Sequence, residues 1–504
     1  MSLKRNIVAS YASQIYITAI GILILPLYIK YMGAEAYGLV GFFVMLQAWF
    51  NLLDLGLTPT IARETASFKA GGHSPLKYRQ LFRALSLIFL FIAIIGGSGL
   101  FLISDYLAKN WLNITKLSTD EVAFCLKIVA IIVALRWISG LYRGTISGSE
   151  KIIWLSSFNV FIATLRFLGI FPIFWHYGTE PEIFFQYQLL IAVVEFCILW
   201  LKSSKILPIL EKSQIEKIGL SIAPIKNTLK FSLSIAFTSS IWTVVTQTDK
   251  LIVSRLLSLE EYGYFTLSVL VASAIVMTYS PISTALLPNL VRLETENKQK
   301  ELIYLYRKST QIITVVSVST AIVLATFSNF ILYLWTHDRH IANIGSTVLT
   351  SYAIGYGFLA ISSLPYYLQY AKGKLDLHIY GSLFYLGLLL PLLFLLTYKF
   401  GIAGTGYAWM ITNFIYFLFW IGFIHRKYLK GLHLSWLLKD VTTPIILPLL
   451  FTIFLTINFK EHSVFFHSLP TLILFVIIIF LTSILSGSHT RSLLISTIKR
   501  FTSR

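Results

Sequence analysis

Residues 84–103 read ALSLIFLFIAIIGGSGLFLI, a stretch without a single charged side chain. As an α-helix rising about 1.5 Å per residue, it is about 30 Å long, which matches the hydrocarbon core of a bilayer. Similar apolar blocks recur along the whole chain, whose 504 residues are 56% hydrophobic and only 12% charged. A soluble domain carries about a quarter charged residues. The sequence therefore predicts an all-α integral membrane protein.

Apolar blocks of about 17 residues or more define fourteen predicted membrane spans. The first six are residues 7–29, 38–55, 84–103, 122–142, 152–175 and 183–201. The next six are residues 231–253, 263–279, 310–334, 348–368, 378–398 and 402–424, and the last two are 442–459 and 469–485. Blocks of this length exclude a β-barrel, whose strands have about 10 residues.

The distribution of basic residues predicts the orientation in the membrane. Most of the 41 Lys and Arg residues fall in segments that lie on one side if the N-terminus is inside. Cytoplasmic loops retain positive charge, so we expect both termini in the cytosol. The net charge of +19 then faces the anionic inner leaflet. A nucleic-acid partner is not expected, because binding one would need these charges on a soluble domain.

Landmarks of the first half recur in the second half, at a spacing close to half the chain. Glu35-Ala36-Tyr37-Gly38 returns as Glu260-Glu261-Tyr262-Gly263, and Pro59-Thr60-Ile61-Ala62-Arg63 returns as Pro288-Asn289-Leu290-Val291-Arg292. Further matches are Arg83 with Arg307, Ser104 with Ser328, Trp111 with Trp335 and Gly148 with Gly373. Both copies of each landmark fall on the same side of the membrane. This predicts two parallel six-helix repeats, whose interface is the usual place for a substrate cavity.

The same pattern gives the expected domain organisation. We expect an N-lobe over residues 1–202 with the first six spans, and a cytoplasmic linker over residues 203–230. A C-lobe follows over residues 231–425, and residues 426–504 hold the last two spans and a cytoplasmic tail.

Seven charged residues fall inside the predicted spans, namely Asp54, Lys127, Arg136, Arg166, Glu195, Asp249 and Lys250. Each costs roughly 2.5–3.5 kcal/mol at a helix centre, so it normally faces a partner or a hydrated cavity. Several belong to polar stripes at helical spacing: Gln47, Asn51, Asp54 and Thr58; Ser156, Asn159 and Arg166; Gln188 and Glu195; Ser239, Thr243, Thr246 and Lys250. These stripes indicate a hydrated cleft, although hydrogen bonds between helices would also explain their Ser and Thr residues.

A cleft with more cations than carboxylates suits an anionic ligand. A guanidinium group can bind a phosphate through two parallel hydrogen bonds. We expect the cavity to be lined by Arg166, Glu195, Asn159, Arg136, Lys250, Asn51 and Gln47, with Asp54 and Asp249 coupling transport to an ion. Arg166 and Glu195 lie at similar depth, so we expect them to pair when no substrate is bound.

The sequence contains no Walker A motif, metal cluster or catalytic triad. We therefore expect neither enzymatic activity nor ATP-driven pumping. No cofactor is expected beyond a coupled proton or sodium ion.

Residues 2–66, SLKRNIVASYASQIYITAIGILILPLYIKYMGAEAYGLVGFFVMLQAWFNLLDLGLTPTIARETA, resemble the start of O-antigen flippases of the Wzx type. The resemblance is carried by Pro26-Leu27-Tyr28, Gly33-Ala34-Glu35-Ala36-Tyr37-Gly38 and Asp54-Leu55-Gly56-Leu57. In the second half, Gln247-Thr248-Asp249-Lys250, followed by Tyr262-Gly263, resembles the matching element of that family.

This resemblance implies the polysaccharide branch of the multidrug/oligosaccharidyl-lipid/polysaccharide exporter superfamily. The implied fold is a V-shaped, MATE-like bundle of two six-helix lobes, here with two additional C-terminal helices. The implied activity is movement of undecaprenyl-pyrophosphate-linked sugar repeat units to the outer leaflet of the bacterial inner membrane. Polysaccharide polymerase and chain-length regulator proteins are the implied partners. The family motifs carry a role in the charged cavity to Asp54 and Asp249.

Two alternatives remain open. A MATE-type cation-coupled drug antiporter has the same fold, but it would need an acidic or aromatic cavity. A membrane glycosyltransferase would need long outer loops with paired carboxylates, and the predicted outer loops are short.

Overall fold

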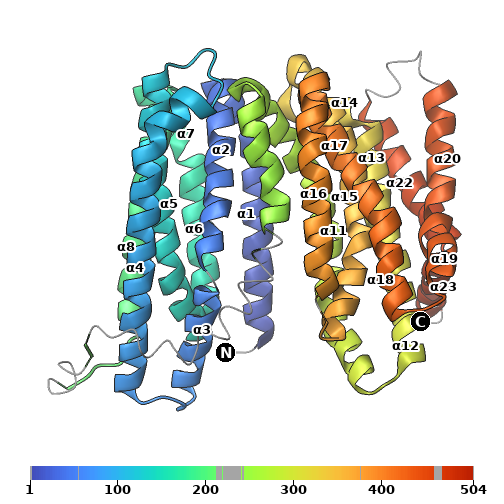
Figure 1. Cartoon of the computed structure of the whole chain (residues 1–504), viewed down its shortest axis with the longest axis horizontal. Helices are drawn as coiled ribbons and strands as arrows, with labels where there is room; N and C mark the ends of the chain where they lie inside the picture. The colour runs from blue at the N-terminus through green and yellow to red at the C-terminus, as the bar shows by residue number, and fades with distance from the viewer. Residues whose placement is uncertain are drawn as a thin grey trace. The chain divides into compact units, whose positions relative to one another are not determined.

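The computed structural model describes residues 3–54, 56–211, 218–219, 240, 243–374, 376–458 and 468–502, which are mostly helical (Figure 1). Among them, 13 helices are long and apolar enough to cross a membrane. Each of the 13 corresponds to one predicted span. The other prediction, residues 231–253, lies partly outside the described residues, and of this region residues 243–256 are described as one helix. The all-α membrane fold class is thus confirmed.

The chain forms two compact units, Met1–Gly263 and Tyr264–Arg504. The first contains α1 (Leu3–Met32), α2 (Ala34–Phe50), η1 (Asn51–Asp54), α3 (Leu57–Lys69), α4 (Pro75–Tyr106), η2 (Leu107–Trp111), α5 (Thr119–Gly148), α6 (Ile152–Leu168), α7 (Ile170–Tyr177) and α8 (Pro181–Ser204). The helix over residues 243–256 and the start of α11 (Leu259–Thr295) belong to it as well. The lobe boundaries expected from the sequence stay a prediction.

Helix α5 is the most buried candidate span of the first unit and packs against α3, α4 and α8. Two glycines let α3 come close to it. A Cβ atom at Gly144 would lie 2.5 Å from Cγ2 of Ile61, and one at Gly148 would clash with the carbonyl oxygen of Ala62. Cβ atoms do not approach neighbouring heavy atoms this closely, so any larger residue would push the two helices apart. Close packing through small residues is typical of membrane helices.

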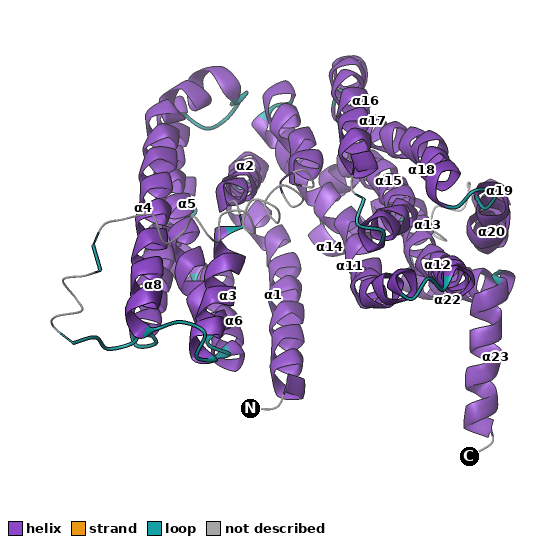
Figure 2. Cartoon of the chain, turned by 60° about the horizontal axis from the view of Figure 1, so that its bottom comes forward, coloured by secondary structure: helices purple, strands orange, loops and turns teal. Residues whose placement is uncertain are grey.

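The second unit contains the rest of α11, then α12 (Gln299–Ile313), η4 (Thr314–Val318), α13 (Ser319–Thr326), α14 (Ser328–Thr336), α15 (Arg339–Ala371), α16 (Asp376–Phe400), α17 (Ile402–Ile415), η5 (Tyr416–Trp420) and α18 (Ile421–Tyr428). It ends with α19 (His433–Trp436), η6 (Leu437–Thr442), α20 (Thr443–Asn458), α22 (Leu469–Ser486) and α23 (Ser488–Thr502). Its most buried span is α15, which packs against α13, α14 and α17 (Figure 2). The helices α5 and α15 correspond to the fourth predicted span of each six-helix set, as expected for an internal repeat.

Helices α20 and α22, here called the C-terminal pair, pack against the other helices of the second unit. Phe475 and Ile479 of α22 form an apolar cluster with Val323 and Phe327. At one end of the pair, the fully buried Asp440 of η6 accepts a hydrogen bond of 2.5 Å from Nε of Arg307. The predicted last two spans are therefore anchored to the second half by both apolar and ionic contacts.

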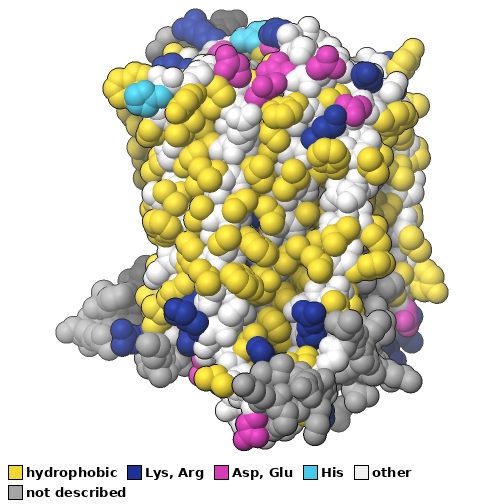
Figure 3. All heavy atoms as spheres, turned by 90° about the vertical axis from the view of Figure 1, so that its left-hand side faces the viewer, with side chains coloured by type: hydrophobic (Ala, Val, Ile, Leu, Met, Phe, Trp, Pro, Cys, Tyr) yellow, Lys and Arg dark blue, Asp and Glu magenta, His cyan; other side chains and the backbone are white. Residues whose placement is uncertain are grey.

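The surface of the first unit has the composition of a membrane-facing protein. Figure 3 shows a broad band of hydrophobic side chains, with charged side chains gathered at its two ends. On α4, the exposed side chains include Leu90, Phe91 and Leu102, which are 47%, 64% and 76% exposed. An apolar surface of this kind is stable against lipid and would aggregate in water.

The predicted orientation can be tested by labelling. We expect cysteine at Lys300 to resist a membrane-impermeant thiol reagent in intact cells and cysteine at Asp338 to react, because these exposed residues lie on opposite predicted sides. Cys125 and the exposed Cys197 must first be replaced by Ala. The reverse pattern would show that the predicted orientation is inverted.

Candidate functional site

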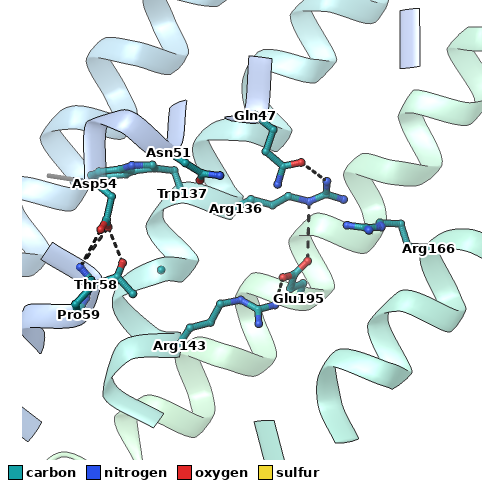
Figure 4. Close-up of a pocket in the computed structure, with 11 residues that line it drawn as sticks. Gln47, Asn51, Asp54, Thr58, Pro59, Arg136, Trp137, Arg143, Arg166 and Glu195 are labelled. Atoms are coloured by element: carbon teal, nitrogen blue, oxygen red, sulfur yellow. Dashed lines mark hydrogen bonds and ion pairs between the residues drawn. The ribbon is translucent and has the colours of Figure 1, made fainter. Parts of the chain in front are cut away.

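A cavity of about 520 Å³ lies within the first unit (Figure 4). It is bounded by residues of α2, η1, α3, α5, α6 and α8. Its lining consists of Gln47, Asn51, Asp54, Thr58, Pro59, Arg136, Trp137, Gly140, Arg143, Arg166 and Glu195. Most of these side chains are polar, although the helices that carry them are apolar.

A break between α2 and α3 places Asp54 and Thr58 at the cavity wall. Gly56 adopts a left-handed conformation with φ 71° and ψ 16°, which glycine adopts without a steric cost. Across this turn, Asp54 Oδ1 accepts a hydrogen bond of 2.6 Å from the Thr58 hydroxyl group and one of 3.2 Å from the Thr58 N–H. Asp54 thus fixes the start of α3, as an N-terminal capping carboxylate does.

Helix α5 carries Arg136, Gly140 and Arg143 along the cavity. Spacings of four and seven residues place them on one helix face. Arg136 is almost completely buried, with 7% of its side chain exposed. Its Nη1 donates to Gln47 Oε1 at 3.2 Å, and its guanidinium group lies over the Phe43 ring at 5.3 Å. Among the described residues, its Nε and Nη2 atoms have no hydrogen-bond partner.

Glu195 of α8 is the buried counter-charge, with 7% of its side chain exposed. Its Oε1 accepts a short hydrogen bond from Nη2 of Arg143, and its Oε2 lies 4.0 Å from Nε of Arg136. Arg143 Nη1 also donates to Asn159 Oδ1 of α6 at 2.5 Å. This network joins α5, α6 and α8 around one carboxylate.

Arg166 lies at the end of α6, where Gly169 separates α6 from α7. Pro172 contributes to this break, because proline cannot donate the backbone bond that would continue a helix. The carbonyl groups of the last turn of α6 are bound by side chains from other helices. Tyr187 Oη donates to the Leu165 oxygen at 2.8 Å, Gln188 Nε2 to the Arg166 oxygen at 3.1 Å, and Tyr28 Oη to the Phe167 oxygen at 3.0 Å.

The prediction that Glu195 pairs with Arg166 is wrong. Both residues do line the same cavity. However, Glu195 pairs with the two arginines of α5. Among the described residues, the Arg166 guanidinium forms no salt bridge and lies over the Phe167 ring at 4.6 Å. Equal depth in the membrane, on neighbouring helices, did not determine which arginine lies nearest to Glu195.

The structure brings most of the predicted site residues together. Those that line the cavity are Gln47, Asn51, Asp54, Arg136, Arg166 and Glu195, and Asn159 reaches it through Arg143. Asp249 and Lys250 are not part of this lining. Lys250 Nζ donates to the Thr246 carbonyl oxygen at 2.6 Å and lies 3.7 Å from Asp249 Oδ1. Their participation in transport stays a prediction.

Arg143 is the functional candidate that sequence analysis missed. The predicted span ended at residue 142, so Arg143 was placed in a cytoplasmic loop, whereas α5 continues to Gly148. Its spacing of seven residues from Arg136, with Gly140 between them, was the available signal.

Comparisons with known proteins now identify the chain. Residues 3–294 match the family described as "Polysaccharide biosynthesis protein". This chain belongs to the polysaccharide biosynthesis protein family. A Shigella flexneri protein named "Putative O-antigen transporter" is 22% identical over 421 residues, which cover 82% of this chain and 95% of that protein.

Solved structures show the same fold. The lipid II flippase MurJ in an inward closed conformation superposes with a TM-score of 0.66 and 16% identity, covering 95% of this chain and 97% of that chain. A multidrug resistance MATE transporter in an inward-facing conformation gives a TM-score of 0.64 and 14% identity, covering 82% and 95%. The resemblance to O-antigen flippases and the fold class expected from the sequence are thereby confirmed.

The charge balance of the cavity in this family member favours an anion. Three arginines face two carboxylates. Glu195 is paired with Arg143, and Asp54 is bound by Thr58. Among the described residues, the cationic groups that remain without a hydrogen-bonded carboxylate are Arg166 and the Nε–Nη2 edge of Arg136. Buried hydrogen-bond donors without acceptors are costly, so an anion that bonds to them would be stabilised.

The Arg143–Glu195 pair should also stabilise the fold. We expect Arg143→Ala to lower the thermal unfolding midpoint of the purified protein by about 2–4 °C. This corresponds to roughly 2 kcal/mol, a value reduced because Arg143 is 30% exposed. Adding Glu195→Gln to this variant should restore part of the loss, since it removes the buried carboxylate that has lost its hydrogen-bonded partner. A double variant as unstable as Arg143→Ala would show that the pair is not the cause.

Proposed function

We propose that this protein is a flippase for undecaprenyl-pyrophosphate-linked oligosaccharide repeat units. It moves them from the cytoplasmic to the periplasmic leaflet of the bacterial inner membrane, with both of its termini in the cytoplasm. Membership of the polysaccharide biosynthesis family and similarity to a protein named as an O-antigen transporter support the substrate class. Polysaccharide polymerase and chain-length regulator proteins are the proposed partners that use the delivered repeat units.

The observation that carries the proposal is a pair of guanidinium groups in the cavity that, among the described residues, have no hydrogen-bonded carboxylate. Arg166 and the Nε–Nη2 edge of Arg136 line the same space. A diphosphate that links a lipid to a sugar carries two negative charges, one on each phosphate, and a monophosphate linkage carries one. Two guanidinium groups therefore match the diphosphate linkage in charge, and each can bind a phosphate bidentately.

The size of the cavity also fits a lipid-linked substrate. A volume of about 520 Å³ lies within the range of small-molecule sites, about 300–1,000 Å³. It holds a diphosphate and adjoining sugar but not a long polyprenyl chain. The lipid tail would then stay in the bilayer while the polar head group crosses through the protein.

A MATE-type drug antiporter is the alternative, because MATE transporters share the fold. Such a protein binds cationic drugs, which the arginines Arg136, Arg143 and Arg166 would repel. The charge of this cavity therefore favours the lipid-linked oligosaccharide.

We expect Arg166→Ala to abolish surface polysaccharide while the protein still reaches the membrane. Arg166→Lys should restore activity only in part, because it keeps the charge and loses the planar fork. Surface polysaccharide is measured in a flippase-deficient strain, and uptake of a defined lipid-linked repeat unit in proteoliposomes. Lys127→Ala is a suitable control, because this span lysine pairs with Asp105 at 2.9 Å outside the cavity. Full activity of Arg166→Ala would contradict the proposed site.

We further propose that transport is coupled to a proton or sodium gradient through Asp54 and Asp249. Asp54→Asn should weaken export and flatten its dependence on the imposed gradient. The amide retains one oxygen for the Thr58 hydrogen bonds, so the α2–α3 break should survive. Thr58→Val tests that structural role separately. If transport in proteoliposomes ignores both gradients even with the native chain, the coupling proposal fails while the flippase proposal stands.

A further inference from the structure

We infer that Glu195 is a displaceable internal counter-ion, which competes with the substrate diphosphate for Arg136 and so keeps binding weak enough for release. The inference rests on the proposed function. It assigns to Glu195 a role opposite to that of a binding residue, since Glu195 lowers the affinity of the site.

The carboxylate of Glu195 faces two arginines with its two oxygens. Oε1 of Glu195 is bound to Arg143, whereas Oε2 lies 4.0 Å from Nε of Arg136. This distance is short enough for an ion pair and too long for a hydrogen bond. Glu195 thus neutralises Arg136 without satisfying its donors, and Figure 4 shows its carboxylate between the two arginines.

Glu195 faces the edge of Arg136 that has open hydrogen-bond donors. The Nε and Nη2 atoms form one side of the planar guanidinium group, the side that binds phosphate or carboxylate bidentately. Among the described residues, neither atom has a hydrogen-bond acceptor. The opposite side is taken, because Nη1 donates to Gln47. The edge with both donors open to an incoming phosphate is therefore the one that Glu195 faces.

A displaced Glu195 carboxylate keeps a partner in Arg143. Arg143 holds Glu195 from the other side and is itself held by Asn159. With 30% of its side chain exposed, Arg143 has more room to move than Arg136, of which 7% is exposed. Glu195 can then move away from Arg136 as part of a neutral pair, and no unpaired charge is left in the membrane interior.

The consequence is an exchange of one ion pair for another. Arg136 is neutralised by Glu195 in the empty site and by phosphate in the loaded site. A cavity without this competitor would hold a dianion too tightly for rapid release, because desolvated guanidinium–phosphate pairs are strong.

The test measures inorganic pyrophosphate binding to the purified full-length protein in nanodiscs, with inorganic phosphate as the weaker reference anion. We expect Glu195→Gln to bind pyrophosphate at least about fivefold more tightly than the native chain, in the range of typical coupling between sites. Transport in proteoliposomes should become slower at the same time. Glu182→Gln is the matched control, because Glu182 lies on the same helix α8 and outside the cavity.

A double variant separates competition from net charge. Arg143→Gln with Glu195→Gln removes the pair and leaves the net charge of the cavity unchanged. If Glu195 competes for Arg136, the double variant also binds pyrophosphate more tightly than the native chain. A return to native affinity would show that added charge alone explains the single variant, and this would overturn the inference. The double variant removes both partners of the Arg143–Glu195 pair, so it also serves as a second test of competition if Glu195→Gln alone is unstable.

The outcomes distinguish this inference from the function it rests on. Unchanged or weaker binding in Glu195→Gln, with activity still lost in Arg166→Ala, would overturn the counter-ion role alone. No pyrophosphate binding by the native chain, together with full activity of Arg166→Ala, would overturn both.

Discussion

The site depends on a single buried carboxylate that makes a cluster of three arginines tolerable inside a membrane protein. Cations at a helix centre are costly, and Arg136, Arg143 and Arg166 face one cavity. Glu195 reduces their mutual repulsion by binding Arg143 and by lying near Arg136. Because Asn159 binds the same Arg143, the network also fixes α5, α6 and α8 to one another. Binding chemistry and helix packing therefore share the same atoms.

Irregular backbone brings the remaining polar groups to this network. Gly56 ends the second span, so that Asp54 and Thr58 turn towards the cavity. Gly169 follows the end of α6, three residues after Arg166, and carbonyl groups of the last turn of α6 also accept hydrogen bonds from Tyr28, Tyr187 and Gln188. Non-helical backbone inside a membrane is stable only where protein or a hydrated cavity covers it. The left-handed turn at Gly56 meets this condition, because Asp54 and Thr58 beside it line the cavity.

The sequence predicted the fold better than it predicted the site. Span positions follow from apolar length, which is a local property, and all 13 candidate spans were anticipated. The polar stripes also gave the correct faces for Gln47, Asn51 and Glu195. Arg143 was missed because its helix runs six residues beyond the apolar block, to Gly148. The partner of Glu195 was wrong because pairing depends on distances between helices that no single-sequence pattern contains.

The two halves of the repeat use equivalent positions for different purposes. Arg83 and Arg307 are matching landmarks, yet Arg83 is exposed, whereas Arg307 binds the buried Asp440 beside the C-terminal pair. Every residue that lines the arginine-rich cavity belongs to the first half. In the second half, Arg307 instead binds Asp440 next to the additional helices. Repeat symmetry thus explains the framework of the protein. The proposed anion site lies where the symmetry is broken, in the charged residues that the first half carries on α5, α6 and α8.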